Sequence, residues 1–148
     1  MSNILEFSSE RELVDVFLEN IHSGVSPWGT ASTAIEFDYQ SGITDVIAIG
    51  SDARLVAFEA KLTRWKVAVH QAFKNTCFAE ESYVVLPKSI ALRAYTQQGE
   101  FLKRRVGLCY VEDSNIVILL AAPRVSPLNL WLNAQATNHI RDNREQLH

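Results

Sequence analysis

Two carboxylates and one lysine, spaced along two neighbouring apolar segments, are the residues best suited to chemistry in this chain. Asp45 lies in the segment 43–49, and Glu59 and Lys61 close the segment 55–61. Both segments have the residue types of strands, and the Gly-Ser-Asp-Ala-Arg sequence between them is typical of a turn. The pattern therefore predicts an antiparallel hairpin that carries all three charged residues.

The expected register of this hairpin brings the charges together, because a turn about Asp52 places Asp45 opposite Glu59. Side chains alternate along a strand, so Glu59 and Lys61 are expected on one face of the sheet. Two carboxylates that face each other across a ladder repel, and unpaired buried charge is costly. A divalent cation between them removes the repulsion, and carboxylate oxygens completed by water suit Mg²⁺. Lys61 is then placed to hold the attacking water or to stabilise negative charge on a phosphate.

An aspartate on one strand, followed by a turn and a Glu-x-Lys sequence on the next strand, resembles the PD-(D/E)XK nuclease superfamily. The core of that superfamily is called restriction-endonuclease-like or Holliday-junction-resolvase-like. The resemblance extends over residues 9–123 and includes Trp65, Gln71 and the segment 83–87. Thr44 stands where the superfamily name has proline, which many members also lack.

The resemblance implies a Mg²⁺-dependent DNA endonuclease that hydrolyses phosphodiester bonds. By this resemblance Asp45 and Glu59 bind the metal, for which Mn²⁺ can substitute, and Lys61 assists the attacking water. The competing interpretation is an edge hairpin on which Glu59 and Lys61 face solvent. Against it, the segment 55–58 is apolar on both faces, as expected of a central strand.

Four further residues are candidates for the same site. Many members of the superfamily add a glutamate from the first helix, and Glu12 fits this place best, with Glu10 second; a capping box at the helix start explains Glu12 without catalysis. Some members use a glutamine on the helix after the Glu-x-Lys strand, sometimes with a tyrosine four residues later. Gln71 fits that glutamine, although position 75 is Asn, and a solvated helix position explains Gln71 equally well. Glu36, on an outer strand, either joins the site or faces solvent.

The surrounding sequence predicts an α/β fold in which a central mixed β-sheet is flanked by helices. One helix is expected before the sheet, and a second crosses between two parallel strands. The expected helices cover residues 9–20, 62–80 and 88–105, and the expected strands cover 33–39, 43–49, 55–61, 83–86, 107–111 and 116–121. One stripe of the crossover helix is expected to pack on the sheet: Trp65, Ala68, Val69, Ala72, Phe73 and Thr76. The tail from residue 127 is either a docked helix or a surface for a partner.

Length and composition predict one globular domain over residues 1–148. The chain is 47% hydrophobic and 21% charged, which favours a packed core over disorder. Apolar stretches stay short of membrane-spanning length, and the N-terminal residues lack the pattern of a signal peptide. A cytoplasmic protein with no membrane association is therefore expected.

The balance of charge fits a DNA-binding protein imperfectly. The formal net charge is −3, whereas a basic footprint is expected of proteins that bind nucleic acid. Basic residues are nonetheless grouped, with Lys61, Arg64 and Lys66 near the Glu-x-Lys sequence and a second group at 103–105. Ordinary solvated surface charge explains the second group equally well.

Two other functions stay open on the sequence alone. A module of the same fold can bind nucleic acid or a protein partner without cutting, as a subunit or as a homodimer. A small interaction protein that works through Trp131 and the tail 127–148 is the third interpretation. Duplex ends, junctions, specific sites, single strands and RNA are all compatible with the same three residues, so the substrate stays open.

Overall fold

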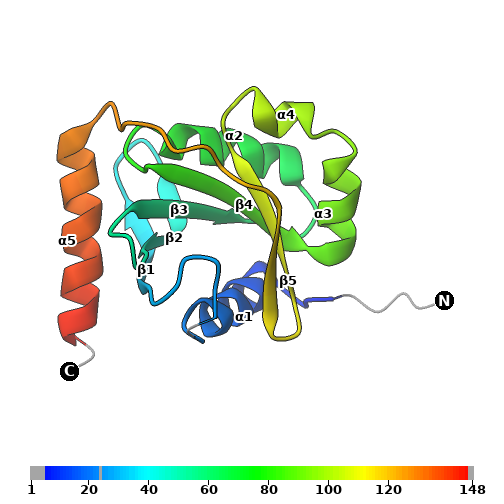
Figure 1. Cartoon of the computed structure of the whole chain (residues 1–148), viewed down its shortest axis with the longest axis horizontal. Coiled ribbons are helices and arrows are strands. Elements are labelled where there is room, and N and C mark those ends of the chain that lie inside the picture. The colour runs from blue at the N-terminus through cyan, green and yellow to red at the C-terminus, as the bar shows by residue number, and fades with distance from the viewer. Residues whose placement is uncertain (1–5, 24, 147–148) are drawn as a thin grey trace.

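A six-stranded mixed sheet, covered by helices on both faces, positions the three candidate residues (Figure 1). The computed structural model describes residues 6–23 and 25–146. In chain order its elements are α1 (Glu10–Ile21), β1 (Ser32–Asp38), β2 (Ile43–Ile49), β3 (Leu55–Ala60), α2 (Trp65–Asn75), β4 (Glu81–Pro87), α3 (Lys88–Tyr95), α4 (Gly99–Leu102), β5 (Gly107–Glu112), β6 (Asn115–Leu120) and α5 (Leu130–Gln146). Within the described ranges, no helix is both long and apolar enough to cross a membrane.

The strands follow one another across the sheet in the order of the chain, from β1 to β6. β1, β2 and β3 form an antiparallel meander, β3, β4 and β5 run parallel, and β6 returns antiparallel to β5. Parallel neighbours need a crossover connection; α2 lies in the first such connection, and α3 and α4 lie in the second. This arrangement confirms the predicted α/β fold with a central mixed sheet and flanking helices.

The predicted hairpin is formed by β2 and β3, which pair antiparallel. Val46 pairs with Phe58 in this register, so one further step along both strands brings Asp45 to Glu59. Every residue of β3 is buried, and β2 and β4 flank it on either side. The alternative of an edge hairpin that faces solvent is therefore wrong, because β3 lies in the middle of the sheet.

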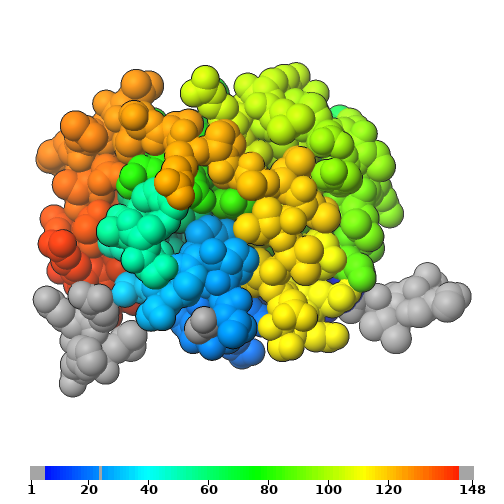
Figure 2. Space-filling view, in the orientation of Figure 1, coloured from blue at the N-terminus to red at the C-terminus, as the bar shows by residue number. Residues whose placement is uncertain are grey.

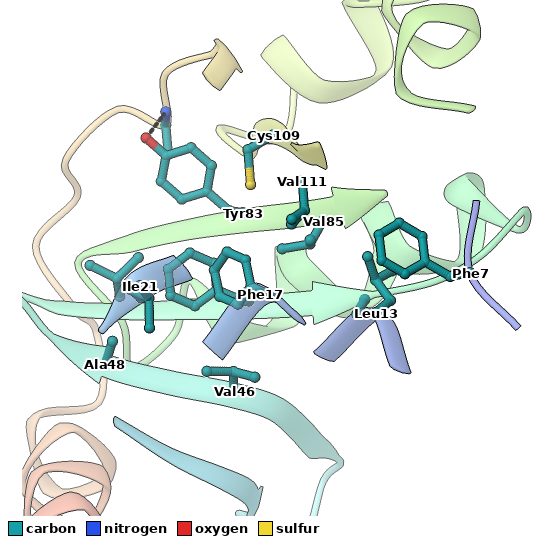
Figure 3. Packing of buried hydrophobic residues seen from close by; sticks show 14 residues of the cluster. Phe7, Leu13, Phe17, Ile21, Val46, Ala48, Tyr83, Val85, Cys109 and Val111 are labelled. Atoms are coloured by element: carbon teal, nitrogen blue, oxygen red, sulfur yellow. Dashed lines mark hydrogen bonds between the residues drawn. The ribbon is translucent and has the colours of Figure 1, made fainter. Parts of the chain in front are cut away.

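The two faces of the sheet carry different helices. On one face, Leu13, Phe17 and Ile21 of α1 pack on side chains of the strands, as Figure 3 shows. Phe17 lies against Phe58 of β3, with 4.7 Å between the ring centroids. On the other face, α2, α3 and α4 share one apolar cluster, and α5 packs on β1 and β2 in another. Side chains from α1 and from α2 therefore approach β3 from opposite sides.

The predicted crossover helix is shorter in the structure, where α2 begins at Trp65 and ends at Asn75. Most of the predicted stripe is buried, but Phe73 is 50% exposed, whereas Asn75 is fully buried. The prediction was wrong for both residues because it followed hydrophobicity. Three residues after Ala72, position 75 returns to the face that packs on the sheet, and the amide is buried there because it finds partners.

The tail forms a helix that docks on the sheet. Leu132, Ala136 and Ile140 of α5 are buried in the apolar cluster that β1 and β2 share with this helix. At its start, Leu128 and Trp131 stay largely exposed. Of the two alternatives for the tail, the structure therefore has the docked helix.

Candidate functional site

The end of β3 brings Asp45 and Glu59 together. Their carboxyl groups hydrogen-bond to each other. Asp45 also accepts a hydrogen bond at Oδ2 from the backbone N–H of Ala60, at 2.8 Å. The two side chains thus meet at the place that the register predicts, with Asp45 held by the backbone of the neighbouring strand.

A buried polar network holds Glu59 from the side of α2. Asn75 Nδ2 donates a hydrogen bond to Glu59 Oε2 at 2.7 Å. The amide oxygen of Asn75 accepts hydrogen bonds from Thr44 Oγ1 at 2.9 Å and from the Tyr39 hydroxyl at 3.3 Å. Glu59 is 1% exposed, and Asn75 and Thr44 are fully buried. The network orients the Glu59 carboxyl and leaves its other oxygen for Asp45.

Burial changes the protonation of this pair. Burial and, after it, the charge of Asp45 raise the pKa of Glu59 to about 8. Burial also raises the pKa of Asp45, although the hydrogen bond from Ala60 works in the opposite direction. Two neighbouring carboxyl groups repel each other when both are ionised, and burial of the site strengthens this repulsion. At neutral pH the two carboxyl groups therefore share one proton.

Lys61 lies beside the pair and reaches toward α1. Its Nζ is 3.7 Å from Glu10 Oε1, and the Lys61 side chain is 22% exposed. The charge of Lys61 lowers the pKa of Asp45 and of Glu59, as a smaller effect than burial. The prediction that Glu59 and Lys61 share one face of the sheet is wrong: Glu59 contacts α2, whereas Lys61 lies beyond the end of β3 and contacts α1 on the opposite face.

Of the two glutamates in the first helix, the structure brings Glu10 to the site and leaves Glu12 out of it. Glu12 belongs to the helix start, where its N–H donates to Oγ of the N-cap Ser9 at 3.0 Å and its carboxylate accepts from Ser8 Oγ at 2.8 Å, in place of the Ser9 N–H that a complete capping box uses. Glu10 pairs with Lys61, and its charge raises the pKa of Asp45. The preference for Glu12 over Glu10 was wrong, because the cap requires Glu12 to point back toward the helix start.

The remaining candidates occupy different places. Glu36 has a φ of 53° and is left out of the β1–β2 ladder at the position across from Asp45. It lines, with Asp45 and Glu10, a cavity of about 220 Å³ between α1 and the strands. Gln71 lies one turn before Asn75 on α2, and its Oε1 is buried without a hydrogen-bond partner in the described ranges. Gln71 is half-buried, and no described contact joins it to the carboxyl pair.

Asn75, Thr44 and Tyr39 are the residues that sequence reasoning missed. The predicted buried stripe of the crossover helix does not include Asn75, and the sequence pattern gives Thr44 no role beyond its place before Asp45. One signal was present: position 75 continues the spacing of Ala68 and Ala72, so an amide there must be buried and must find a partner. Its partner Glu59 lies far away in sequence.

The donor set fits a cation that binds through few protein ligands. Among residues 6–23 and 25–146, no group of three or more His, Cys, Asp or Glu side chains is placed to hold a metal ion. Ala60 and Asn75 occupy one oxygen of Asp45 and of Glu59, which leaves one oxygen of each for a shared proton or for a cation in its place. Mg²⁺ is often held by one or two carboxylates, with waters and substrate phosphates as its other ligands. The pair meets that minimum.

Asn75→Leu is expected to lower the free energy of unfolding by about 1–3 kcal/mol, because Thr44 and Glu59 lose a buried hydrogen-bond partner. Urea denaturation of the purified variant measures this effect. Gln71→Leu is the matched control on the same helix. Its oxygen has no described partner, so an apolar side chain of similar size should change stability by less than about 1 kcal/mol. Equal losses in both variants would contradict a specific role for Asn75.

Comparison with known proteins supports the fold. The sequence matches no protein-family model and no curated protein. Among solved structures, the chain is similar to SPO1766 from Silicibacter pomeroyi, a protein of unknown function, with a TM-score of 0.69 and 12% sequence identity. The similarity covers 96% of this chain and 90% of that chain, so it extends over the whole α/β fold of both.

Proposed function

We propose that the chain is a Mg²⁺-dependent DNA endonuclease of the PD-(D/E)XK type with a restriction-endonuclease-like core. The observation that carries the proposal is the hydrogen-bonded pair of Asp45 and Glu59 at the end of a central strand, with Lys61 beside it. Burying two carboxyl groups side by side inside a sheet is costly for stability, so a function is the best explanation for their presence. Carboxylate pairs of this kind are best suited to binding a divalent cation in place of the shared proton.

The order of the elements supports the same proposal. The aspartate lies on β2, the Glu-x-Lys sequence ends β3, and α2 crosses to the parallel strand β4. The sequence resembles the superfamily through the same elements in the same order. We also propose that the protein is cytoplasmic, as the sequence leads us to expect.

Each residue of the site has a defined part in the proposed reaction. Mg²⁺, when bound, supplies Lewis-acid chemistry: it lowers the pKa of water and offsets the negative charge of a phosphate. Asp45 and Glu59 hold the cation through the oxygens that Ala60 and Asn75 leave unused. Glu59 must first release its proton, so affinity for the cation is expected to rise as the pH approaches 8. Lys61 Nζ donates a hydrogen bond to the attacking water or to the scissile phosphate.

The second candidate function is a module of this fold that binds nucleic acid or a protein partner without cutting. The observation that favours it is the protonated, almost fully buried Glu59, together with the small number of carboxylates in the described site. In such a module the shared proton stays in place, and the carboxyl pair is only a polar part of the core. Either function is compatible with a homodimer.

Calorimetric titration with Mg²⁺ and Mn²⁺ at a pH above 8 distinguishes the two functions. The nuclease proposal predicts binding by the wild type and loss of binding in Asp45→Asn. Asp142→Asn, which removes an exposed carboxylate of α5, is the control and should bind as the wild type does. The titration is repeated with a short DNA duplex present, because phosphates complete many Mg²⁺ sites. Failure to bind under both conditions would favour the non-catalytic module.

A further inference from the structure

A groove lined by basic residues lies away from the carboxyl site. Its volume is about 610 Å³, larger than the cavity of about 220 Å³ beside Asp45. Lys103, Arg104 and Arg105 reach it from the turn after α4, and Arg124 reaches it from the segment before α5. Figure 2 shows this segment, in orange, beside the yellow-green α4 region at the top of the view. No Asp or Glu is among the described residues that line the groove.

This concentration of positive charge is unusual for a chain with a net charge of −3. Within the described ranges Arg105 has no ion pair. Lys103 and Arg104 pair with Glu100 at 3.1 and 3.2 Å, and Arg124 lies 3.8 Å from Glu81 and 3.9 Å from Asp52. The Lys103 and Arg124 side chains are 58% and 69% exposed, and ion pairs of side chains this exposed contribute little. Lys103, Arg105 and Arg124 are therefore the cations most available to a polyanion.

Apolar side chains interrupt the basic surface. Phe73 of α2 is 50% exposed and Leu128 is 92% exposed, and both line the groove. A basic groove that contains an exposed aromatic ring is the combination with which proteins hold single-stranded nucleic acid. Cations follow the phosphates, and the ring stacks on a base. A fully paired duplex offers no free base face to Phe73, so the apolar part of the groove favours a single strand.

The groove and the carboxyl site lie at opposite ends of β3. Arg124 is paired with Glu81 at the start of β4, and Val125 N–H donates to the Glu80 carbonyl there at 2.9 Å. Glu59, in contrast, lies near the end of β3, which runs parallel to β4. Glu81 pairs with Val56, and Glu59 lies three residues further along β3, which is about 10 Å along the strand. The groove is thus a second surface, and its Phe73 lies on the exposed side of α2, whereas Asn75 of the same helix is buried and contacts Glu59.

We propose that this groove binds a single strand of DNA through its phosphates and one stacked base. The choice of DNA over other polyanions rests on the proposed function. The binding itself needs neither a metal ion nor Asp45 and Glu59. In the complete protein the groove holds a single-stranded part of the substrate, while a duplex or junction lies at the carboxyl site.

Fluorescence anisotropy with a labelled DNA strand of about 20 nucleotides, in the presence of EDTA, tests the proposal. Lys103→Gln/Arg105→Gln should weaken binding about tenfold or more and reduce the slope of log affinity against log salt by roughly 1.4. Arg93→Gln/Arg141→Gln removes the same charge from exposed positions on α3 and α5 and should bind within about twofold of the wild type. Phe73→Leu should weaken binding several-fold without a change in the salt slope.

Three outcomes would overturn the proposal. The first is equal binding by the groove variant and its charge-matched control. The second is tighter binding of duplex DNA, or of RNA with the same sequence, than of the single strand. The third is displacement of the strand by poly-glutamate at equal charge concentration, which would identify a general polyanion site. Because the assay contains no metal and measures binding alone, failure of the nuclease proposal leaves its result unchanged.

Discussion

Asp45→Asn is expected to lower Mg²⁺-dependent cleavage of DNA by at least about 10³-fold while leaving the fold intact, a loss of roughly 4 kcal/mol of transition-state stabilisation. The substitution removes the charge that would hold the cation. An amide oxygen still accepts the hydrogen bond from the Ala60 N–H, so the end of β3 keeps its structure. Purified wild type and variant are compared on linear, branched and single-stranded DNA, with and without Mg²⁺.

The variant of Glu59 must be chosen with its surroundings in mind. Glu59→Ala leaves the Asn75 amide buried without its partner, so a loss of activity could follow from a loss of stability. Glu59→Gln keeps an oxygen for Asn75 and a donor for Asp45, and it removes only the capacity to carry charge. We expect Glu59→Gln to lose cleavage as Asp45→Asn does, with a normal circular dichroism spectrum.

Lys61→Met completes the series by removing a charge and keeping the aliphatic stem. Loss of a residue that assists proton transfer or charge stabilisation is expected to cost about 10²–10⁴-fold in rate. Glu12→Gln is the control, because Glu12 belongs to the helix cap, and a cap variant is expected to act through stability alone. Unchanged cleavage in Asp45→Asn or Lys61→Met would remove the assignment of the site.

The free energy of unfolding is expected to fall as the pH rises from about 5 to about 8.5. The pKa of Glu59 is about 8 in the folded chain and 4.5 ordinarily, so between these values the folded state binds more protons than the unfolded state. The stabilisation is complete below pH 4.5 and disappears as the pH rises through 8. Its size is at most about 5 kcal/mol, from the difference between the two pKa values.

Urea denaturation of the wild type and of Glu59→Gln, at several pH values between 5 and 8.5, measures this contribution. The variant cannot titrate at position 59, so its stability should depend less on pH than that of the wild type. Burial also raises the pKa of Glu81, which acts in the same direction in both proteins. The difference between the two pH profiles is therefore the result to compare, and parallel profiles would contradict the shared proton.

Mg²⁺ should reverse this trend if the nuclease proposal holds. A cation that binds only the folded chain stabilises it in proportion to the logarithm of its concentration above Kd. Because binding displaces the proton, the gain in stability should be largest at high pH and absent in Glu59→Gln. In the non-catalytic alternative, Mg²⁺ leaves both pH profiles unchanged.

The sequence by itself determined the local structure that carries the carboxyl pair. The strand-forming residues of β2 and β3, with a short turn between them, set a register in which Asp45 lies across from Glu59. The N-cap Ser9 determined the start of α1 in the same way, since its side chain accepts a hydrogen bond from the Glu12 N–H in the first turn. Such features depend on residues only a few positions apart, and their physics is already complete in a short segment.

Tertiary structure alone decided which distant side chains complete the site. Asn75 is buried because α2 crosses the sheet at a place where Glu59 and Thr44 offer it partners. Glu10 reaches Lys61 because α1 packs over the end of β3. The basic groove unites segments that precede and follow β5 and β6. These contacts arise from the packing of whole elements, which no local sequence pattern specifies. A polar group needs a protein partner only after packing has excluded water from it, because an unpaired polar group is costly only when it is buried.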